Sequence, residues 1–304
     1  MVKIAYLVEA HTDIDRLLCL CDALLLSGDI FIHVDKKTQD KDFWKLLNGY
    51  QSSQKRVTVL TSRHYVAWGG YSQVECFHSL LQEALASSVQ YDRFLLLSGL
   101  DFPVWKPQMI KDFFEENKIK EFVCGYEISN CGDWKQLHKI VNYHFFRDIH
   151  LPQKSLLRRA ILWASRTILS KLRIHRNPYL NIGNDTWNIY YGSSWIGVTR
   201  QCAEYIDEIL NDKQFKSYFK TTYAPDELCV PTIVFNSRFR SNAMAGDKLS
   251  FKELTPLHYL NYIDYIWSYD EKDFDDIVGS GKMFVRKVIS GKSEKLVDLI
   301  KATW

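Results

Sequence analysis

The sequence predicts an α/β protein with a central, mostly parallel sheet. Apolar runs of strand length alternate with segments of helical spacing through the first half of the chain. The runs are apolar on consecutive residues, which is typical of parallel strands that helices cover on both faces. We expect strands at 2–10, 29–35, 56–60, 92–99 and 120–126, and helices at 13–28, 71–87 and 106–117.

The middle of the chain has a strongly basic segment. No Asp or Glu occurs between Ile149 and Asn184, whereas residues 154–176 contain seven Lys and Arg side chains. Apolar residues recur there at helical intervals, which predicts a basic amphipathic helix or helical hairpin; they are Leu157, Ile161, Ile168 and Leu172. Two interpretations stay open. The segment is either a solvated excursion packed on the domain, or an interfacial helix whose Trp163 and leucines meet an anionic membrane.

The remaining elements extend the same architecture. A strand, a turn and a second strand are expected at 187–200, then a helix at 201–212 and another that begins near Pro225. The chain has neither an internal repeat nor a low-complexity linker. We therefore expect one domain over residues 1–304, with the basic excursion at about 152–176.

Composition excludes several classes of protein. With 46% hydrophobic and 25% charged residues the chain is globular, and no apolar stretch approaches the roughly 20 residues of a membrane-spanning helix. A net charge of +3 gives no support for nucleic-acid binding. The seven cysteines contain no C-x-x-C pair, so neither a disulfide framework nor a zinc site is indicated. The apolar N-terminal run lacks a cleavage-site pattern, which favours a cytoplasmic protein.

Polar residues follow the predicted strands at positions where α/β proteins bind ligands. Asp35 could accept a hydrogen bond from a ribose hydroxyl or a pyrimidine N–H, or serve only the turn, and the two interpretations are equally supported. Asp101 precedes Phe-Pro, which also favours a turn. Glu227 either caps a helix or faces a cleft as a catalytic carboxylate. These residues lie in the stretches "IHVDKK" (32–37), "LSGLDFP" (97–103) and "APDE" (224–227).

Motifs for cofactors and metals are missing. No glycine-rich phosphate loop follows a strand, which argues against P-loop NTPases and dinucleotide enzymes. No pair of histidines has the spacing of metal ligands. The Asp-x-Asp string at 13–15 opens a predicted helix, and the string at 40–42 lies in a charged surface run. We therefore expect neither a metal nor a resident cofactor.

Six motifs occur in order along the chain: "HVDKK", "WGGYSQVE", "LLLSGLDFPV", "GSSWIGVTR", "YAPDELCVPTIVFNS" and "GKMFVRKV". Together they resemble the core-2/I-branching β-1,6-N-acetylglucosaminyltransferase family, which includes the peptide O-xylosyltransferases. The resemblance runs from about residue 2 to about residue 288. It implies a GT-A-type fold, a UDP-sugar donor, inversion at the anomeric carbon and catalysis without a metal.

The resemblance assigns roles to individual residues. Glu227 matches the catalytic base, and Lys287 matches a lysine that reaches the diphosphate. Glu127 and Trp195 are expected to contact the acceptor. The other residues expected to bind or shape the donor site are His11, Asp35, Lys36, Lys37, Trp68, Asp101 and Arg286.

The assigned roles make chemical sense together. Inverting transfer needs one carboxylate to take the proton of the acceptor hydroxyl, while cationic side chains neutralise the leaving diphosphate. Two features depart from the animal enzymes. Residues 261–274 contain no arginine where those enzymes have one, so either Arg286 replaces it or donor binding is weaker. The missing anchor and disulfide pattern resemble a bacterial cytoplasmic member.

We therefore expect a transferase that moves a sugar from a UDP-sugar to a glycan or glycolipid hydroxyl, as in polysaccharide biosynthesis. N-acetylglucosamine is the first expectation for that sugar and xylose the second. The basic segment 154–176 would add peripheral contact with the inner face of a membrane. The alternative is a catalytically silent nucleotide- or glycan-binding protein with the same fold.

Overall fold

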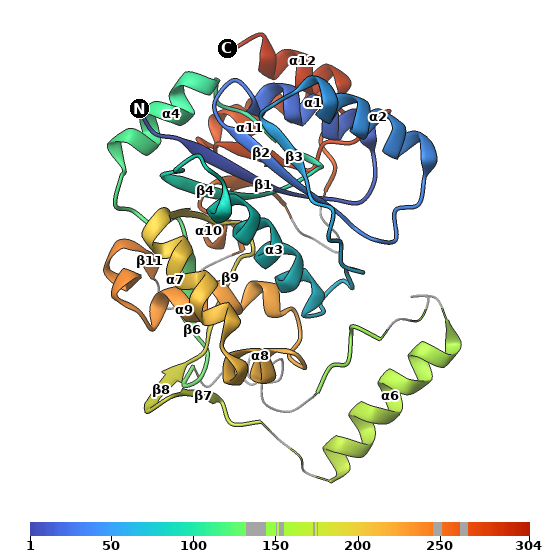
Figure 1. The fold of residues 1–304 in the computed structure, drawn as a ribbon, viewed down its shortest axis with the longest axis vertical. Helices are drawn as coiled ribbons and strands as arrows, with labels where there is room; N and C mark the ends of the chain where they lie inside the picture. The colour runs from blue at the N-terminus through green and yellow to red at the C-terminus, as the bar shows by residue number, and fades with distance from the viewer. Residues whose placement is uncertain are drawn as a thin grey trace.

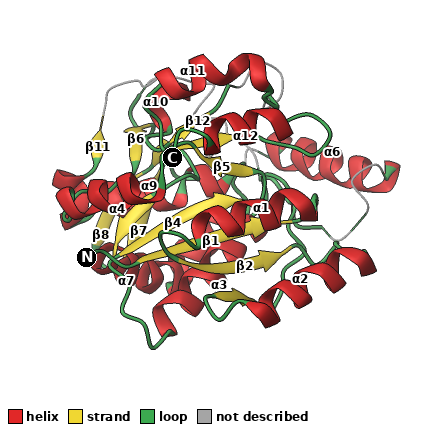
Figure 2. Cartoon of the chain, turned by 90° about the horizontal axis from the view of Figure 1, so that it is seen from above, coloured by secondary structure: helices red, strands yellow, loops and turns green. Residues whose placement is uncertain are grey.

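The computed structural model describes residues 1–131, 144–149, 151, 155–172, 174, 176–245, 251–261 and 267–304. Its central sheet has five strands in the order β10-β4-β1-β2-β3. All of them run parallel except β10, which is antiparallel to β4. Figure 2 shows β1 and β2 side by side and pointing the same way. The strands are β1 (Ile4–Ala10), β2 (Asp29–Val34), β3 (Val57–Val59), β4 (Arg93–Ser98) and β10 (Gly197–Thr199).

Helices cover both faces of this sheet, as the continuous apolar strands predict (Figure 1). Side chains alternate along β1, so Ala5 and Leu7 pack into one core cluster and Tyr6 and Val8 into another. The first cluster includes residues of α3 (Ser72–Ala86) and α7 (Arg200–Asn211). The second includes residues of α1 (Ile14–Leu24), α2 (Lys41–Ser53) and α4 (Pro107–Glu116). The predicted α/β fold, with a mostly parallel central sheet that helices flank, is therefore confirmed.

Aspartates begin the first two helices. The Asp13 carboxylate accepts a hydrogen bond from the backbone N–H of Arg16 at 3.3 Å, at the start of α1. Asp40 accepts from the N–H groups of Asp42 and Phe43, at 2.8 and 3.1 Å. The string at 13–15 thus opens a helix as expected. The string at 40–42 is exposed, as expected of a charged surface run, and it also begins a helix, α2, that was not predicted.

Two smaller sheets flank the central one. Their orders are β11-β6-β9 and β12-β13-β5, and β7 and β8 form a hairpin. The strands are β5 (Asp101–Pro103), β6 (Cys124–Glu127), β7 (Tyr179–Ile182), β8 (Asp185–Asn188), β9 (Tyr190–Gly192), β11 (Met244–Ala245), β12 (His258–Tyr259) and β13 (Phe284–Arg286). The remaining helices near them are α8 (Lys213–Phe219), η2 (Pro225–Glu227), α9 (Cys229–Phe235), η3 (Arg238–Asn242), α10 (Phe251–Leu254), η4 (Glu271–Asp273), α11 (Phe274–Gly279) and α12 (Glu294–Lys301).

The basic segment forms helix α6 (Leu156–Lys171), which Figure 1 shows set apart from the sheets. The predicted span was 154–176, and Lys154 and Arg173 lie outside the described residues. In the part of the chain that the structure describes, no helix is long and apolar enough to cross a membrane.

Candidate active site

The carboxyl ends of β1, β2 and β4 meet at one edge of the central sheet. The backbone N–H of Asp35 donates to the carbonyl of Ala10 at 2.8 Å, which joins the loop after β2 to the end of β1. His11, Asp35 and Asp101 follow the three strands, so the residues predicted at strand ends come together here. This is the edge at which open α/β sheets bind ligands.

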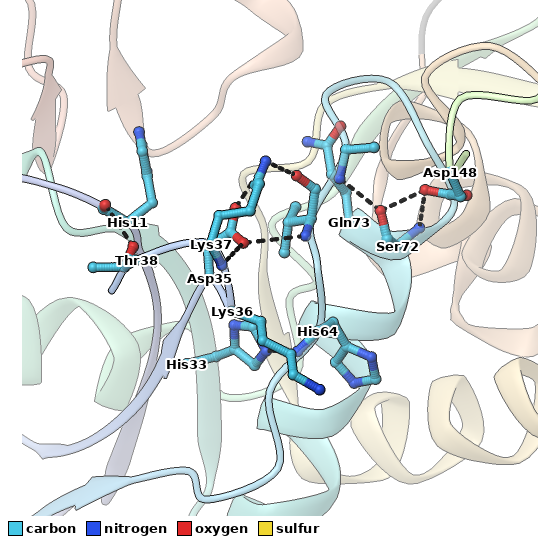
Figure 3. Close-up of polar contacts among 12 residues, drawn as sticks. His11, His33, Asp35, Lys36, Lys37, Thr38, His64, Ser72, Gln73 and Asp148 are labelled. Atoms are coloured by element: carbon cyan, nitrogen blue, oxygen red, sulfur yellow. Dashed lines mark hydrogen bonds and ion pairs between the residues drawn. The ribbon is translucent and has the colours of Figure 1, made fainter. Parts of the chain in front are cut away.

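Asp35 is held within its own turn (Figure 3). Its Oδ1 accepts the N–H of Lys37 at 2.9 Å and that of Val66 at 3.4 Å. Its Oδ2 lies 3.1 Å from Lys37 Nζ, and the Asp35 side chain is only 9% exposed. Lys36 instead reaches outward, with its Nζ 5.3 Å from the ring centre of Tyr65. These contacts are those expected of a residue that stabilises the turn. Binding of a nucleotide by Asp35 stays a prediction.

His11 lies among the cations of the site. Burial and the charge of Arg286 lower the pKa of His11, with smaller contributions from Lys37 and Lys287, and the charge of Asp35 opposes them. The imidazole is therefore favoured in its neutral form, which leaves the positive charge of this edge on the lysine and arginine side chains.

Asp101 forms a buried ion pair with Arg286. Its carboxylate lies 2.9 Å from Arg286 Nη1 and 3.2 Å from His258 Nε2, and it accepts the N–H of Ser98 at 2.8 Å. Burial alone would raise the pKa of Asp101, but Arg286, His258 and Ser98 together hold that pKa below its ordinary value. Asp101 is completely buried, and its carboxylate fixes the position of the Arg286 guanidinium.

The charged groups of Arg286 and Lys287 have different partners. The Arg286 guanidinium, paired with Asp101, also lies 4.6 Å from the ring centre of Trp195. Trp195, predicted on the acceptor side, therefore meets a donor-side cation. Burial and the charge of Arg286 lower the pKa of Lys287, and Lys287 forms no ion pair among the described residues. Lys287 is thus better placed than Arg286 to meet a diphosphate.

The turn at η2 presents two carboxylates with different partners. Glu227 forms a side-chain hydrogen bond with the phenol of Tyr191. Asp226 accepts from Ser194 Oγ at 2.7 Å and from Gln73 Nε2 at 3.3 Å. The N-cap of α9 is Leu228, with no side-chain cap bond. The structure therefore does not support the interpretation of Glu227 as a helix cap.

The loop around Trp68 is joined to this turn. Ala224 adopts a left-handed backbone conformation with φ of 50°, which costs a non-glycine residue about 1–2 kcal/mol. Its N–H donates to the carbonyl of Gly69 at 3.2 Å. Trp68 is 60% exposed, and its ring meets Tyr223 edge-on at 5.9 Å between ring centres. Trp68 therefore lies beside the Asp226–Glu227 turn.

Glu127 is not brought into this cluster. It pairs with Tyr190 across β6 and β9, whereas Tyr126 pairs with Tyr191. Side chains alternate along a strand, so the side chains of Glu127 and Tyr191 lie on opposite faces of that sheet. Its carboxylate accepts a hydrogen bond from Asn130 Nδ2. The structure thus separates Glu127 from the pair formed by Tyr191 and Glu227.

Glu9 belongs to the site but was not predicted. Burial and the nearby charge of Asp226 raise the pKa of Glu9 to about 8, and the Cys76 side chain hydrogen bonds to it. Arg286 and Asp101 also act on this carboxyl group. The only available signal was a single acidic residue inside the apolar run "IAYLVEA". At neutral pH Glu9 is therefore largely protonated, and its carboxyl group lies within the electrostatic reach of Asp226, Arg286 and Asp101.

Comparison with known proteins agrees with this geometry. The family model described as Core-2/I-Branching enzyme matches residues 4–272. The chain is 21% identical over 306 aligned residues to human "N-acetyllactosaminide beta-1,6-N-acetylglucosaminyl-transferase", covering 93% of this chain and 67% of the human protein. It is 31% identical over 130 residues to "Xylosyltransferase oxt" of Drosophila melanogaster, covering 41% of this chain and 14% of the fly protein. It is 22% identical over 222 residues to "Xylosyltransferase sqv-6" of Caenorhabditis briggsae, covering 71% of this chain and 24% of the nematode protein.

The relatives are thus named glycosyltransferases of two kinds, and this chain spans about a quarter or less of the xylosyltransferases. The prediction of a glycosyltransferase is confirmed at that level. Because the family model matches most of the chain, the chain belongs to the Core-2/I-branching enzyme family of glycosyltransferases.

Proposed function

We propose that the protein transfers a sugar from a UDP-sugar to a hydroxyl of a glycan, with inversion and without a metal. The observation that carries this proposal is the placement of Glu227. Its carboxylate hydrogen bonds to Tyr191 in the turn beside Trp68, and the loop that carries Lys287 reaches the same edge of the sheet. N-acetylglucosamine is the first candidate for the transferred sugar and xylose the second, following the names of the relatives.

The chemistry divides between two groups of side chains. Glu227 takes the proton of the acceptor hydroxyl as the hydroxyl oxygen attacks the anomeric carbon. The bond to the diphosphate breaks, and the negative charge on the leaving group is met by Lys287, with Arg286 behind it. Lys287 is suited to this role because no carboxylate among the described residues pairs with it. Asp35, His11 and the lysines after β2 would hold the nucleotide.

Binding of nucleotides tests this proposal. We would measure the thermal shift of the protein with UDP, UDP-N-acetylglucosamine and UDP-xylose, each with EDTA and with manganese. Ligands that bind only the folded state raise the melting temperature, so UDP should stabilise the protein equally in both buffers. The sugar nucleotide with the larger shift identifies the donor. Stabilisation that requires manganese would contradict the role of Lys287, and no shift with any nucleotide would contradict the proposed function.

We also propose that α6 contacts an anionic membrane surface, as an enzyme with a glycolipid acceptor requires. Its apolar face is exposed, with Trp163 63% accessible and Leu157 and Ile168 also exposed, and Leu172 is exposed directly after the helix. Arg159 and Arg166 are exposed on the same helix. This combination of an apolar face and basic side chains is typical of helices that lie in the headgroup region.

One basic residue of α6 serves a different purpose. Arg158 is only 6% exposed, and its Nη2 donates to the carbonyl of Arg147 at 3.0 Å. Arg158 was expected to face the membrane with the other basic side chains, and that expectation was wrong. Its guanidinium is buried because it attaches α6 to the segment that precedes the helix.

A further inference from the structure

An arginine lies against the two aromatic rings beside the candidate base. The Cζ atom of Arg147 is 5.5 Å from the ring centre of Trp68 and 5.2 Å from that of Tyr223. The two rings meet edge-on, and Phe145 packs on Tyr223 at 5.1 Å between centres. The partly buried guanidinium and the largely exposed indole therefore lie together at one place on the protein surface.

The positive charge of Arg147 is not neutralised by its sequence neighbour. The carboxylate of Asp148 accepts from the N–H of Ser72 at 3.3 Å and from Ser72 Oγ at 2.5 Å (Figure 3). It also accepts from the N–H of Tyr71 at 2.8 Å. Among the residues that the structure describes, Arg147 forms no ion pair. No acidic residue follows until Asp185. Arg147 thus keeps a net positive charge at this place.

The position of this cluster is fixed relative to the candidate base. Asp148 bonds to the first turn of α3, and it packs so closely that a Cβ at Gly70 would lie 2.3 Å from its Oδ1. Gln73, in the same turn of α3, bonds to Asp226 at 3.3 Å. Trp68 and Arg147 are therefore held on the same frame as the turn that carries Glu227.

We propose that Trp68, Tyr223 and Arg147 form a subsite for an acceptor sugar that carries an anionic group, either a carboxylate or a phosphate, so that Trp68, expected beside the donor, instead meets the acceptor. An aromatic face packs against the apolar face of a pyranose ring, while a guanidinium binds carboxylate or phosphate oxygens through paired N–H donors. The inference rests on the proposed function, because it names the acceptor of the same site. It extends that proposal from any glycan hydroxyl to a hydroxyl on or next to an acidic sugar.

The subsite is tested by the binding of matched probes to the full chain. Tryptophan fluorescence would be titrated with methyl β-D-glucuronide, methyl β-D-glucoside and glucose 1-phosphate. The first two differ only in having a carboxylate or a hydroxymethyl group at C6. We expect the anionic probes to bind about 10-fold or more tightly than the neutral glucoside, a preference worth about 1.4 kcal/mol. A response to the glucuronide alone identifies a uronic acid, and a response to the phosphate alone identifies a phosphorylated sugar.

Variants assign the response to the cluster. Arg147→Gln should remove the preference for the anionic probes, and Arg147→Lys should restore part of it, because lysine keeps the charge but not the paired donors. Trp68→Phe should abolish most of the fluorescence change. Arg238→Gln, an exposed arginine on η3 whose guanidinium lies over the ring of Phe239, is the matched control and should bind as the wild type does.

The same samples separate the two possible failures. Equal binding of anionic and neutral probes, no binding of either, or a preference that survives Arg147→Gln would overturn the subsite. UDP would be added to each variant as a second readout. A normal thermal shift with UDP alongside one of those results leaves the proposed function standing, whereas loss of the UDP shift in the wild type removes the proposed function itself.

Discussion

The carboxylate of Asp101 and the guanidinium of Arg286 lie 2.9 Å apart, although 185 positions separate them in the sequence. Strands β5 and β13 pair these two residues in register, and Asp101 is completely buried. Removing one partner of a buried ion pair leaves the other charge uncompensated, which typically costs about 3–5 kcal/mol. We therefore predict that Asp101→Asn lowers the free energy of unfolding by an amount near that range at neutral pH, as measured by urea denaturation.

The same pair makes stability depend on acid. Because the pKa of Asp101 is depressed in the folded state, the pair stabilises the protein above the pKa of an unfolded aspartate, and this contribution is lost as the pH falls through the folded pKa. The difference between the wild type and Asp101→Asn should therefore shrink in acid. Asp112→Asn, an aspartate bonded to Gln108 on the surface of α4, is the control, and an equal loss in that variant would refute the explanation.

Tyr191 should matter to Glu227 through its hydroxyl group. Hydrogen bonds to charged groups contribute about 1.5–3 kcal/mol, so Tyr191→Phe should slow UDP release from the donor by about 10-fold or more. A donor to a carboxylate favours its ionised form. The acidic limb of the pH–rate profile should therefore move to higher pH in the variant. Tyr205→Phe on α7 should change neither quantity, and an unmoved acidic limb in Tyr191→Phe would exclude the positioning role.

Ionisation of Glu9 should produce an alkaline limb in the pH–rate profile. Its pKa is raised to about 8, so ionisation above that pH places a second negative charge beside Asp226. We expect the rate to fall through this range in the wild type. Glu9→Gln imitates the protonated acid and should keep activity to higher pH. Its stability relative to the wild type should also increase as the pH rises from the pKa of an unfolded glutamate toward 8. In this range the unfolded wild type releases the proton of Glu9 while the folded wild type keeps it, which destabilises the folded wild type. An alkaline limb that persists in Glu9→Gln would assign that limb to another group.

The membrane contact of α6 predicts a specific dependence on charge. The protein should sediment with vesicles of anionic lipid and not with neutral vesicles, and added salt should weaken the binding. Changing Arg159, Arg166 and Lys171 to glutamine should abolish sedimentation, since each basic residue near an anionic surface contributes about 1 kcal/mol. Lys111, Lys216 and Lys295, changed to glutamine together, provide a control of equal charge. Failure of the wild type to sediment would refute the contact.

Sequence patterns reveal some of these features and conceal others. The strands β1, β2 and β4 were predicted because strands buried on both faces produce continuous apolar runs. Helix α2 was missed because only Phe43 and Leu47 are buried along it, and its sequence is otherwise polar. Strands β5, β12 and β13 have two or three residues each, too few for any period to show.

The site divides in the same way. Glu227, Asp35 and Lys287 were proposed from the sequence because each lies in a motif that resembles the family, and their roles stay predictions. Tyr191 and Arg147 contact residues that are distant in the sequence, so no local pattern marks them. Glu127 was predicted as an acceptor contact, but a shift of one position along β6 decides which face of the strand a side chain occupies. The face that a residue of a short strand occupies is therefore known only from the pairing of the strands in the structure.

The central claim is that Glu227 is the catalytic base, and Glu227→Gln tests it most directly. Glutamine keeps the size of the side chain but cannot take a proton at neutral pH. We predict that UDP release from the donor nucleotide falls by about 10²–10⁴-fold, while UDP still stabilises the variant as it does the wild type. Glu204→Gln, on the surface of α7, should retain full activity. Turnover by Glu227→Gln equal to that of the wild type would contradict the assignment.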